Sequence, residues 1–239
     1  MNILLIGYGK MGKAIEEIAL QRGHTIVGKI DNKEQLLRFD GNADVAIEFT
    51  QPEAVISNLR YCFDRKLPVV CGTTGWLEHA KELELGCRNK GGALLYSANF
   101  SLGVNLFFKL NETLALLMKP YTDYAVSIDE THHTQKKDAP SGTAITLAEG
   151  IIKNQPLKKN WVLNGTNAAT NTEQSVVITS HRIDPVPGTH TVSYRSAIDD
   201  IQITHTAHSR HGFALGAVLV AEWLKGKTGV FKMDDFLGF

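Results

Sequence analysis

The sequence has few cysteines, no net charge and no long apolar segment. Only three cysteines occur in 239 residues (Cys62, Cys71 and Cys87), with neither a CxxC pair nor another metal-binding spacing. An odd number does not suit a disulfide framework, so we expect reduced, buried thiols in a reducing compartment. Lysine and arginine total 25, as do aspartate and glutamate. Charge therefore gives no reason to expect nucleic acid or an anionic membrane as a partner.

The apolar segments are too short for membrane insertion or secretion. The longest of them, residues 213–221, is about half the length that spans a bilayer. The N-terminal segment, residues 3–6, has no positive residue before it and is too short for a signal peptide. We therefore expect a cytoplasmic protein that binds neither nucleic acid nor a membrane.

The first hundred residues alternate short apolar runs with segments of helical spacing. The overall composition, 43% hydrophobic and 21% charged, is typical of a globular chain of one large or two small domains. Strands are predicted at 3–6, 25–30, 44–49, 68–71 and 93–96, and helices at 10–22, 52–66 and 76–89. Repeated strand–helix units predict a parallel sheet covered by helices on both faces.

From about residue 102 the pattern changes. Helices are predicted at 102–118 and 141–153, and period-two alternation predicts strands around 124–128, 176–178, 192–194 and 201–203. Residues 164–174 are predicted to form a polar surface loop, and an apolar helix at 213–224 is expected to return to the first domain. We predict an α/β fold. A Rossmann-like doubly wound parallel sheet occupies residues 1–100 and 211–239, and a second α+β domain with an open mixed sheet occupies residues 101–210.

A glycine-rich GxGxxG motif follows the first predicted strand and opens the first predicted helix. It consists of Gly7, Tyr8, Gly9, Lys10, Met11 and Gly12. The first glycine permits a tight turn, the second lets a pyrophosphate approach the backbone, and the third allows close helix–strand packing. The helix N-terminus adds free amides for the phosphates. Asp31 ends the next strand, where an acid would hold the adenosine ribose hydroxyls.

Asp31 leaves the choice between NADH and NADPH open. An acid at this position favours NADH, whereas nearby lysines provide charge for a 2′-phosphate. These lysines are Lys10, Lys29 and Lys33. We expect NADH, NADPH or both as cofactor; the alternative is that Asp31 is a solvated turn residue beside Asn32.

Two further loops are expected to line the cofactor crevice, because loops after parallel strands meet at one edge of the sheet. The first follows the fourth strand and the second follows the fifth. The expected cofactor-side residues are Gly72, Thr73, Thr74, Ser97, Ala98, Asn99 and Phe100. The alternative for the first loop is a tight turn that needs flexible glycines.

Residues 130–144 hold the densest group of reactive side chains. His132 and His133 end a predicted strand, and Lys136 follows shortly after. Such groups suit a dicarboxylate substrate, and a histidine or lysine here can protonate a developing carbanion. Gly142 and Thr143 then begin a helix, whose exposed amides and Thr143 hydroxyl form a carboxylate site.

Other roles for these side chains stay open. Adjacent strand residues face opposite sides, so one or both histidines can be structural. Four histidines are candidate zinc ligands, but no carboxylate or thiolate at a matching spacing supports such a site, and no metal is expected. They are His132, His133, His205 and His208. Ser141 lacks the GxSxG context of a hydrolase nucleophile. Three arginines are candidates for carboxylate clamps or for surface ion pairs: Arg182, Arg195 and Arg210.

Together these motifs resemble the 4-hydroxy-tetrahydrodipicolinate reductase (dihydrodipicolinate reductase) family over nearly the whole chain. The matching segments are GYGKMG at 7–12, GTTG at 72–75, SANFSLGVN at 97–105, ETHHTQKKDAPSGTA at 130–144, GTH at 188–190 and HTAHSRHGFALGA at 205–217. The block at 130–144 is highly specific, whereas many dehydrogenases share the glycine motif.

The resemblance implies a reductase of the diaminopimelate route to lysine. Hydride would pass from NAD(P)H to C4 of a small cyclic unsaturated dicarboxylate, and an acid would then protonate the resulting enamine. By resemblance, His132 handles the proton, Lys136 is the general acid, and His133, Gly142 and Thr143 bind the substrate carboxylates. The family also implies a homotetramer formed by pairing sheets of the second domain, with the active site between the domains.

Two departures from the family pattern stand out. The glycine loop is one residue shorter than the common form, which could alter cofactor preference, and Asp184 replaces a usual glycine before Gly188. One rival interpretation is an amino-acid or semialdehyde dehydrogenase, but that chemistry does not need the PSGT turn beside the histidines. Another is a regulator that senses redox state, but a sensor needs only the first domain.

Overall fold

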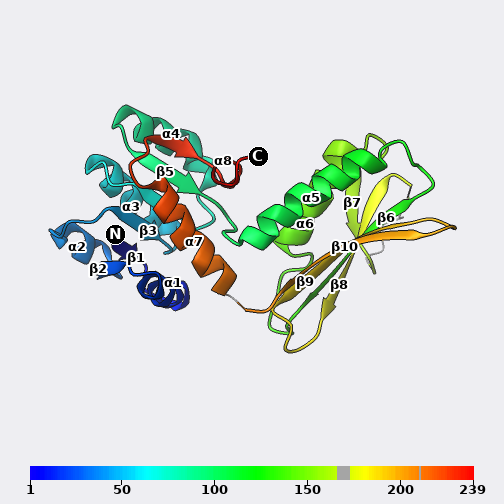
Figure 1. Ribbon diagram of the computed structural model, residues 1–239, viewed down its shortest axis with the longest axis horizontal. Coiled ribbons are helices and arrows are strands. Elements are labelled where there is room, and N and C mark those ends of the chain that lie inside the picture. The colour runs from blue at the N-terminus through cyan, green and yellow to red at the C-terminus, as the bar shows by residue number, and fades with distance from the viewer. Residues whose placement is uncertain (166–172, 210) are drawn as a thin grey trace. The chain divides into compact units, whose positions relative to one another are not determined.

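The computed structural model describes residues 1–165, 173–209 and 211–239, which form two compact units (Figure 1). The first unit consists of Met1–Leu102 and His211–Phe239, and the second of Gly103–Arg210. Most of the polar loop expected at 164–174 lies outside the described residues. Among the helices described, none is long and apolar enough to cross a membrane.

The first unit contains a six-stranded sheet in which every described pairing is parallel. The strand order is β11-β5-β4-β3-β1-β2. The strands are β1 (Asn2–Ile6), β2 (Thr25–Ile30), β3 (Val45–Glu48), β4 (Val69–Cys71), β5 (Ala93–Tyr96) and β11 (Gly229–Phe231). The order reverses beside β1, so loops after β1 and β3 lie at a switch point where such sheets bind ligands.

Helices cover both faces of this sheet. One core cluster joins α1 and α7 to the sheet, and the other joins α2, α3 and α4 to the opposite face. The helices are α1 (Lys10–Gln21), α2 (Lys33–Arg38), α3 (Pro52–Asp64), α4 (Ala80–Asn89), preceded by a 3-10 turn at Leu77–His79, α7 (His211–Leu224) and α8 (Met233–Leu237). The predicted doubly wound parallel sheet is confirmed, and α7 returns to it as expected.

The second unit contains a five-stranded sheet of mixed orientation, in the order β10-β9-β6-β8-β7. The strands are β6 (Ala125–His132), β7 (Asn160–Leu163), β8 (Ser175–Arg182), β9 (Gly188–Arg195) and β10 (Asp200–Ala207). β6 pairs in parallel with β8 and antiparallel with β9. The predicted open mixed sheet is therefore confirmed.

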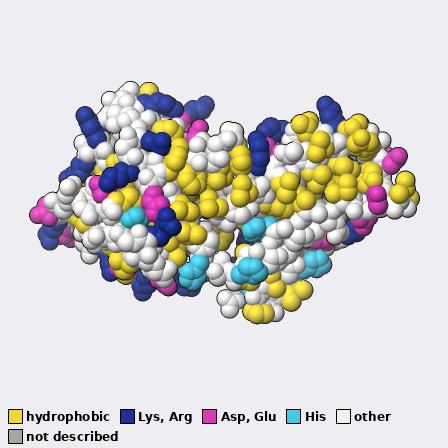
Figure 2. All heavy atoms as spheres, in the orientation of Figure 1, with side chains coloured by type: hydrophobic (Ala, Val, Ile, Leu, Met, Phe, Trp, Pro, Cys, Tyr) yellow, Lys and Arg dark blue, Asp and Glu magenta, His cyan; other side chains and the backbone are white. Residues whose placement is uncertain are grey.

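Two helices, α5 (Leu102–Met118) and α6 (Gly142–Asn154), pack with one face of this second sheet. The opposite face carries mainly small polar side chains, as the period-two burial of β6 and β9 indicates. The long helix α5 also exposes leucines, and Figure 2 shows hydrophobic side chains along it. The most exposed of these are Leu106, Leu110, Leu116 and Leu117.

The cysteines are free and buried, as expected from their number. Burial raises the pKa of the Cys62 and Cys71 thiols, and it raises the pKa of Cys87 to about 11. A protonated, enclosed thiol reacts slowly, so these cysteines are structural.

Candidate active site

The glycine motif forms a tight turn between β1 and α1. Gly7 has φ +96°, a conformation that favours glycine, and its amide donates to the Ile30 carbonyl at 2.7 Å. A Cβ on Gly12 would lie 2.3 Å from the Gly7 oxygen, so only glycine lets α1 approach this closely. A Cβ on Gly9 would meet open space. The turn thus combines close packing at both ends with an accessible backbone in the middle.

A pocket of about 410 Å³ opens beside this turn. Its walls come from the loops after β1, β2 and β3 and from α3, and include Gly7, Tyr8, Gly9, Asp31, Lys33, Phe49 and Thr50. The Asp31 carboxylate accepts a hydrogen bond from the Tyr8 amide at 3.0 Å. Asp31 is therefore a fixed wall of the pocket and not only a solvated turn residue.

The lysines near Asp31 differ in their surroundings. Lys29 forms an ion pair with Glu16 at 2.6 Å and lies 4.8 Å from the centre of the Tyr8 ring. Its charge is therefore already balanced. Lys33 lines the pocket, whereas Lys10 is exposed at the first position of α1.

The two predicted loops after β4 and β5 adjoin the pocket walls. Thr73 Oγ1 accepts a hydrogen bond from the Thr50 amide at 2.7 Å, and the Thr73 carbonyl accepts one from the Trp76 indole at 2.7 Å. The Phe49 ring lies 5.7 Å from that of Phe100 and also covers Gly72. None of the seven residues predicted in these two loops is among those that line the described pocket.

Glu48, at the end of β3, is a buried acid that sequence reasoning did not single out. It accepts hydrogen bonds from the Thr50 hydroxyl, from Asn58 Nδ2 at 3.1 Å and from Cys71 Sγ at 3.2 Å. Thr50 and Asn58 line the pocket. Glu48 thus joins two segments of the pocket wall to β4.

In the second unit, β6 ends in the buried His132. Its ring lies 5.0 Å from that of His190 on β9, in an edge-on arrangement. Burial and the nearby His190 lower the pKa of His132 to about 4, although Glu130 opposes the shift. His132 is therefore neutral at neutral pH.

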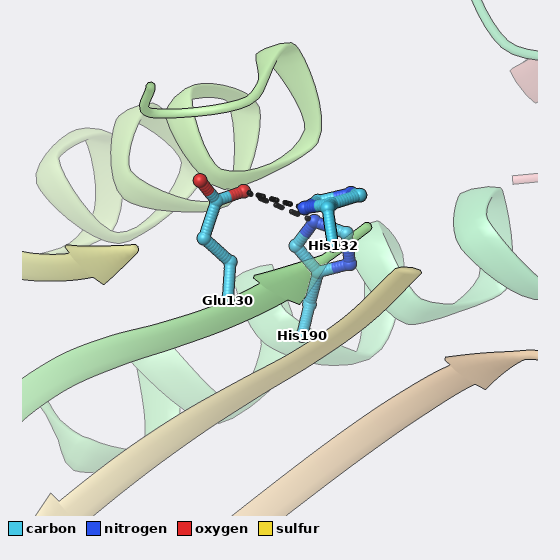
Figure 3. Close-up of side chains that lie close together, drawn as sticks. All are labelled: Glu130, His132 and His190. Carbon is cyan, nitrogen blue, oxygen red and sulfur yellow. Dashed lines mark ion pairs between the residues drawn. The ribbon is translucent and has the colours of Figure 1, made fainter. Parts of the chain in front are cut away.

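Glu130 lies at the centre of this region (Figure 3). It is fully buried and faces His190 and Ser180 across the neighbouring strands. Its carboxylate lies 3.4 Å from His132 Nδ1 and 3.7 Å from His190 Nε2. Burial would raise the pKa of Glu130, but the contact with His190 and hydrogen bonds from Ser141 and Ser180 hold that pKa well below its usual range.

The loop after β6 carries Lys136. Its ammonium donates to both carboxylate oxygens of Asp138 at 2.8 Å. The guanidinium of Arg182, at the end of β8, donates to the Lys136 carbonyl at 3.3 Å and to the Asp138 carbonyl at 2.5 Å. Two charged side chains therefore hold this loop, one through a side chain and one through the backbone.

The loop then leads into the first turn of α6. Ser141 caps the helix, because its hydroxyl accepts from the Ala144 amide at 3.2 Å, and that hydroxyl also lies 3.1 Å from His190 Nε2. The amides of Gly142 and Thr143 lie in the first turn, where a helix provides no acceptor for them. This end of α6 has the geometry of an anion site.

His133 follows directly after β6 and is partly exposed. The next residue, Thr134, donates its amide and its hydroxyl to the Asp184 carboxylate, at 3.0 and 2.5 Å. These hydrogen bonds lower the pKa of Asp184. The glycine-to-aspartate departure therefore adds an anchor for the segment that carries His133.

Within the described residues, the four candidate zinc histidines do not form a cluster of possible ligands. Within the described part of the chain, the potential ligand atoms that gather within 4.8 Å of one another belong to Glu130, His132 and His190. The Glu130 carboxylate there accepts protein hydrogen bonds and has the Arg182 guanidinium 3.4 Å away, an arrangement that opposes a cation. Of the candidate arginines, Arg195 pairs with Asp200 at the surface at 3.6 Å, and Arg210 lies outside the described residues.

Sequence reasoning missed the roles of Glu130, His190 and Arg182. One signal was available, since Glu130 lies two residues before His132 and therefore shares its strand face. Their meeting with β8, β9 and α6 depends on strand order, which the local pattern does not contain.

Comparison with known protein families finds two matching models that together span almost the whole chain. The model described as "Dihydrodipicolinate reductase, N-terminus" matches residues 1–100, and that described as "Dihydrodipicolinate reductase, C-terminus" matches residues 103–237. The two matches meet near residue 102, where the chain passes between the two units.

Individual relatives give the same result. The 4-hydroxy-tetrahydrodipicolinate reductase of Christiangramia forsetii is 52% identical over 239 residues, covering 99% of this chain and 98% of the relative. That of Neisseria meningitidis is 36% identical, covering 82% of this chain and 73% of the relative. Among solved structures, dipicolinate-bound dihydrodipicolinate reductase from Paenisporosarcina sp. TG-14 has the same fold. Its TM-score is 0.75 at 21% identity, over 97% of each chain.

Proposed function

The chain belongs to the dihydrodipicolinate reductase family, and from that premise we propose how its own residues carry out the reaction. It is an oxidoreductase that reduces 4-hydroxy-tetrahydrodipicolinate to tetrahydrodipicolinate with a nicotinamide cofactor, in the diaminopimelate route to lysine. The observation that carries the proposal is the loop 133–141, which contains Lys136 and leads directly into the N-terminus of α6.

The first unit holds the cofactor. The Gly7–Gly12 turn and the N-terminus of α1 bind the pyrophosphate, because Gly9 leaves its backbone open and the helix supplies amides. Asp31 binds the adenosine ribose from the wall of the 410 Å³ pocket. The loops Gly72–Thr74 and Ser97–Phe100 lie on the nicotinamide side. The bound cofactor supplies the hydride.

Both NADH and NADPH are accepted, with NADH preferred. The Asp31 carboxylate repels a 2′-phosphate, and Lys29 is already paired with Glu16 at 2.6 Å. Lys33 remains at the pocket as a cation that can approach the phosphate. One repulsive and one attractive group make the preference moderate.

The second unit binds the dicarboxylate. Gly142 and Thr143 hold one carboxylate through their amides and the Thr143 hydroxyl, since the helix N-terminus favours an anion there. His133, anchored by the bonds between Thr134 and Asp184, contacts the other. Lys136 adds positive charge beside them.

Lys136 is the general acid that protonates the enamine left by hydride addition at C4, which gives the product. Both oxygens of the Asp138 carboxylate accept from its ammonium at 2.8 Å, so the side chain is held in one orientation. His132, with a pKa of about 4, is neutral at neutral pH and therefore accepts or orients a hydrogen bond there instead of donating the proton.

The active protein is a homotetramer. The family resemblance implies pairing of the second sheets, and the sheet face opposite α5 and α6 carries small hydroxyl side chains, including Thr191 and Thr204, which hydrogen-bond across β9 and β10 at 3.0 Å. Light scattering of the purified protein tests this directly. A monomer of 26.3 kDa would contradict it.

The activity is tested by following nicotinamide oxidation with substrate generated in situ from pyruvate and aspartate semialdehyde. Runs with NADH and NADPH should both show turnover, faster with NADH. No oxidation with either cofactor, despite tight cofactor binding, would overturn the proposed substrate. Equal rates would overturn the role of Asp31 in cofactor choice.

A further inference from the structure

The buried carboxylate of Glu130 has no part in the reaction as described above, yet it lies between His132 and His190 (Figure 3) and also contacts the start of α6 and β8. It accepts the Ser141 amide at 3.0 and 3.2 Å and the Ser180 hydroxyl at 2.6 Å. His132 and His190 border it on the remaining side. Because the Glu130 side chain is fully buried, bulk solvent does not contact its carboxylate.

Arg182 extends the same contacts to the lysine loop. One Nη2 atom lies 3.4 Å from Glu130 Oε1 and 2.5 Å from the Asp138 carbonyl, and Nε reaches the Lys136 carbonyl at 3.3 Å. The guanidinium therefore joins a buried acid to the backbone on both sides of residue 137. A planar group with several donors suits such a junction better than lysine would.

We propose that Glu130 and Arg182 form a positioning pair that holds the Lys136 loop and the carboxylate-binding end of α6 in register with each other. The inference rests on the proposed function for the roles of Lys136 and Thr143. Glu130 fixes where α6 begins, through Ser141, and Arg182 fixes the backbone that carries Lys136. Neither side chain needs to touch the substrate.

The charge of Glu130 is essential to this role, because the Ser141 amide, the Ser180 hydroxyl and the Arg182 guanidinium all donate to its carboxylate. An amide group in the same place would turn its NH₂ toward a donor and leave a buried group unsatisfied. Hydrogen bonds to an ionised acceptor are also stronger than neutral ones. A shorter acid would keep the charge but would not span the distances to both Ser141 and Arg182.

The first experiment compares Glu130→Gln with the matched control Glu112→Gln. Glu112 lies in the same unit and pairs with Lys153 near the surface at 3.5 Å. We expect Glu130→Gln to lower kcat/KM about 100-fold, the usual cost of misplacing reacting groups by about an ångström, with both a lower kcat and a higher KM for the dicarboxylate. The Glu112 variant should keep wild-type kinetics. Cofactor affinity, measured by fluorescence, should stay within about twofold in both.

Amide exchange measured by mass spectrometry separates positioning from general loss of structure. In Glu130→Gln we expect faster exchange in peptides covering residues 133–145, with β9 and β10 unchanged. Faster exchange throughout the second unit would mean that Glu130 only stabilises the fold and would overturn the proposal. Kinetics within twofold of wild type would overturn it too. The amide-exchange measurement needs no turnover, so it still tests the pair if the proposed substrate proves wrong.

A double-mutant cycle tests whether the two residues act as one unit. Arg182→Met alone should resemble Glu130→Gln, and the double variant should be no more than about threefold worse than the weaker single variant, because the second change removes a contact that is already lost. Independent, multiplied losses would show two separate roles and would refute the pair.

Discussion

Acid should destabilise the second unit through His132, which titrates differently in the folded and unfolded chain. Burial lowers the pKa of His132 to about 4, whereas a histidine in an unfolded chain titrates near about 6.5. Between these values the unfolded chain binds a proton that the folded chain does not. The free energy of unfolding therefore falls as the pH is lowered through this window.

The size of the effect follows from the gap between the two pKa values. They differ by about 2.5 pH units, and each is worth about 1.4 kcal/mol, so the full loss below pH 4 is about 3 kcal/mol. Between pH 8 and pH 5 the loss is about 2 kcal/mol. Glu130 affects stability only at lower pH. Its pKa in the folded protein is depressed, so the stability that its carboxylate adds is lost only as the pH falls below its unfolded pKa of about 4.3.

The measurement compares urea unfolding of the wild type and His132→Gln at pH 5 to 8. Amide exchange in peptides of β6, β8 and β9 reports the second unit separately from the first. The variant loses packing at every pH, but its deficit relative to wild type should shrink by about 2 kcal/mol on going from pH 8 to pH 5. Above pH 7.5 the deficit should be constant, which provides the internal control. Two parallel pH profiles would refute the reasoning.

Three substitutions test the proposed roles one at a time. Lys136→Ala should lower kcat by about 10²- to 10⁴-fold, the usual range for a general acid, and an unchanged rate would remove Lys136 from the mechanism. Thr143→Val should raise KM for the dicarboxylate by about tenfold, as loss of a hydrogen bond to a charged group predicts, with unaltered cofactor affinity; equal effects on both would misplace the carboxylate site. Asp31→Ala should weaken NADH binding by at least about tenfold and reduce the preference for NADH over NADPH, and identical titration curves for variant and wild type would exclude the ribose contact.

The sequence predicted the elements that carry a strong local pattern. The bounds of β2, β5 and α5 agree with the apolar runs and helical spacing that predict them. The short elements α2, β7, β11 and α8 were missed, because three to six residues hold too little of either period. β7 and β11 are strands only because a neighbouring strand pairs with them.

The same contrast between local pattern and long-range pairing applies to the residues of the candidate site. Residues of one contiguous segment, from His132 to Thr143, could be predicted because their chemistry is adjacent in the sequence. Glu130 was overlooked because its environment is formed by Ser180 and His190. These residues are 50 and 60 positions away in the sequence and lie beside Glu130 only through strand pairing. The Glu48 contacts in the first unit are long-range in the same sense.

The position of α7 near the C-terminus affects the order in which the two units can fold during synthesis. Six residues of α7 belong to the core that also contains β1 and β3, so the first unit is incomplete until the ribosome has released residues beyond 211. The 108 residues of the second unit are made in between, which takes roughly 5 to 20 s at ordinary translation rates. During that time α1 alone covers its face of the N-terminal sheet, whereas the inserted unit has all of its described strands once residue 207 has been made, before α7. The substrate-binding half can therefore fold first, and the N-terminal half is the part of the nascent chain for which a chaperone that binds apolar surface is most needed.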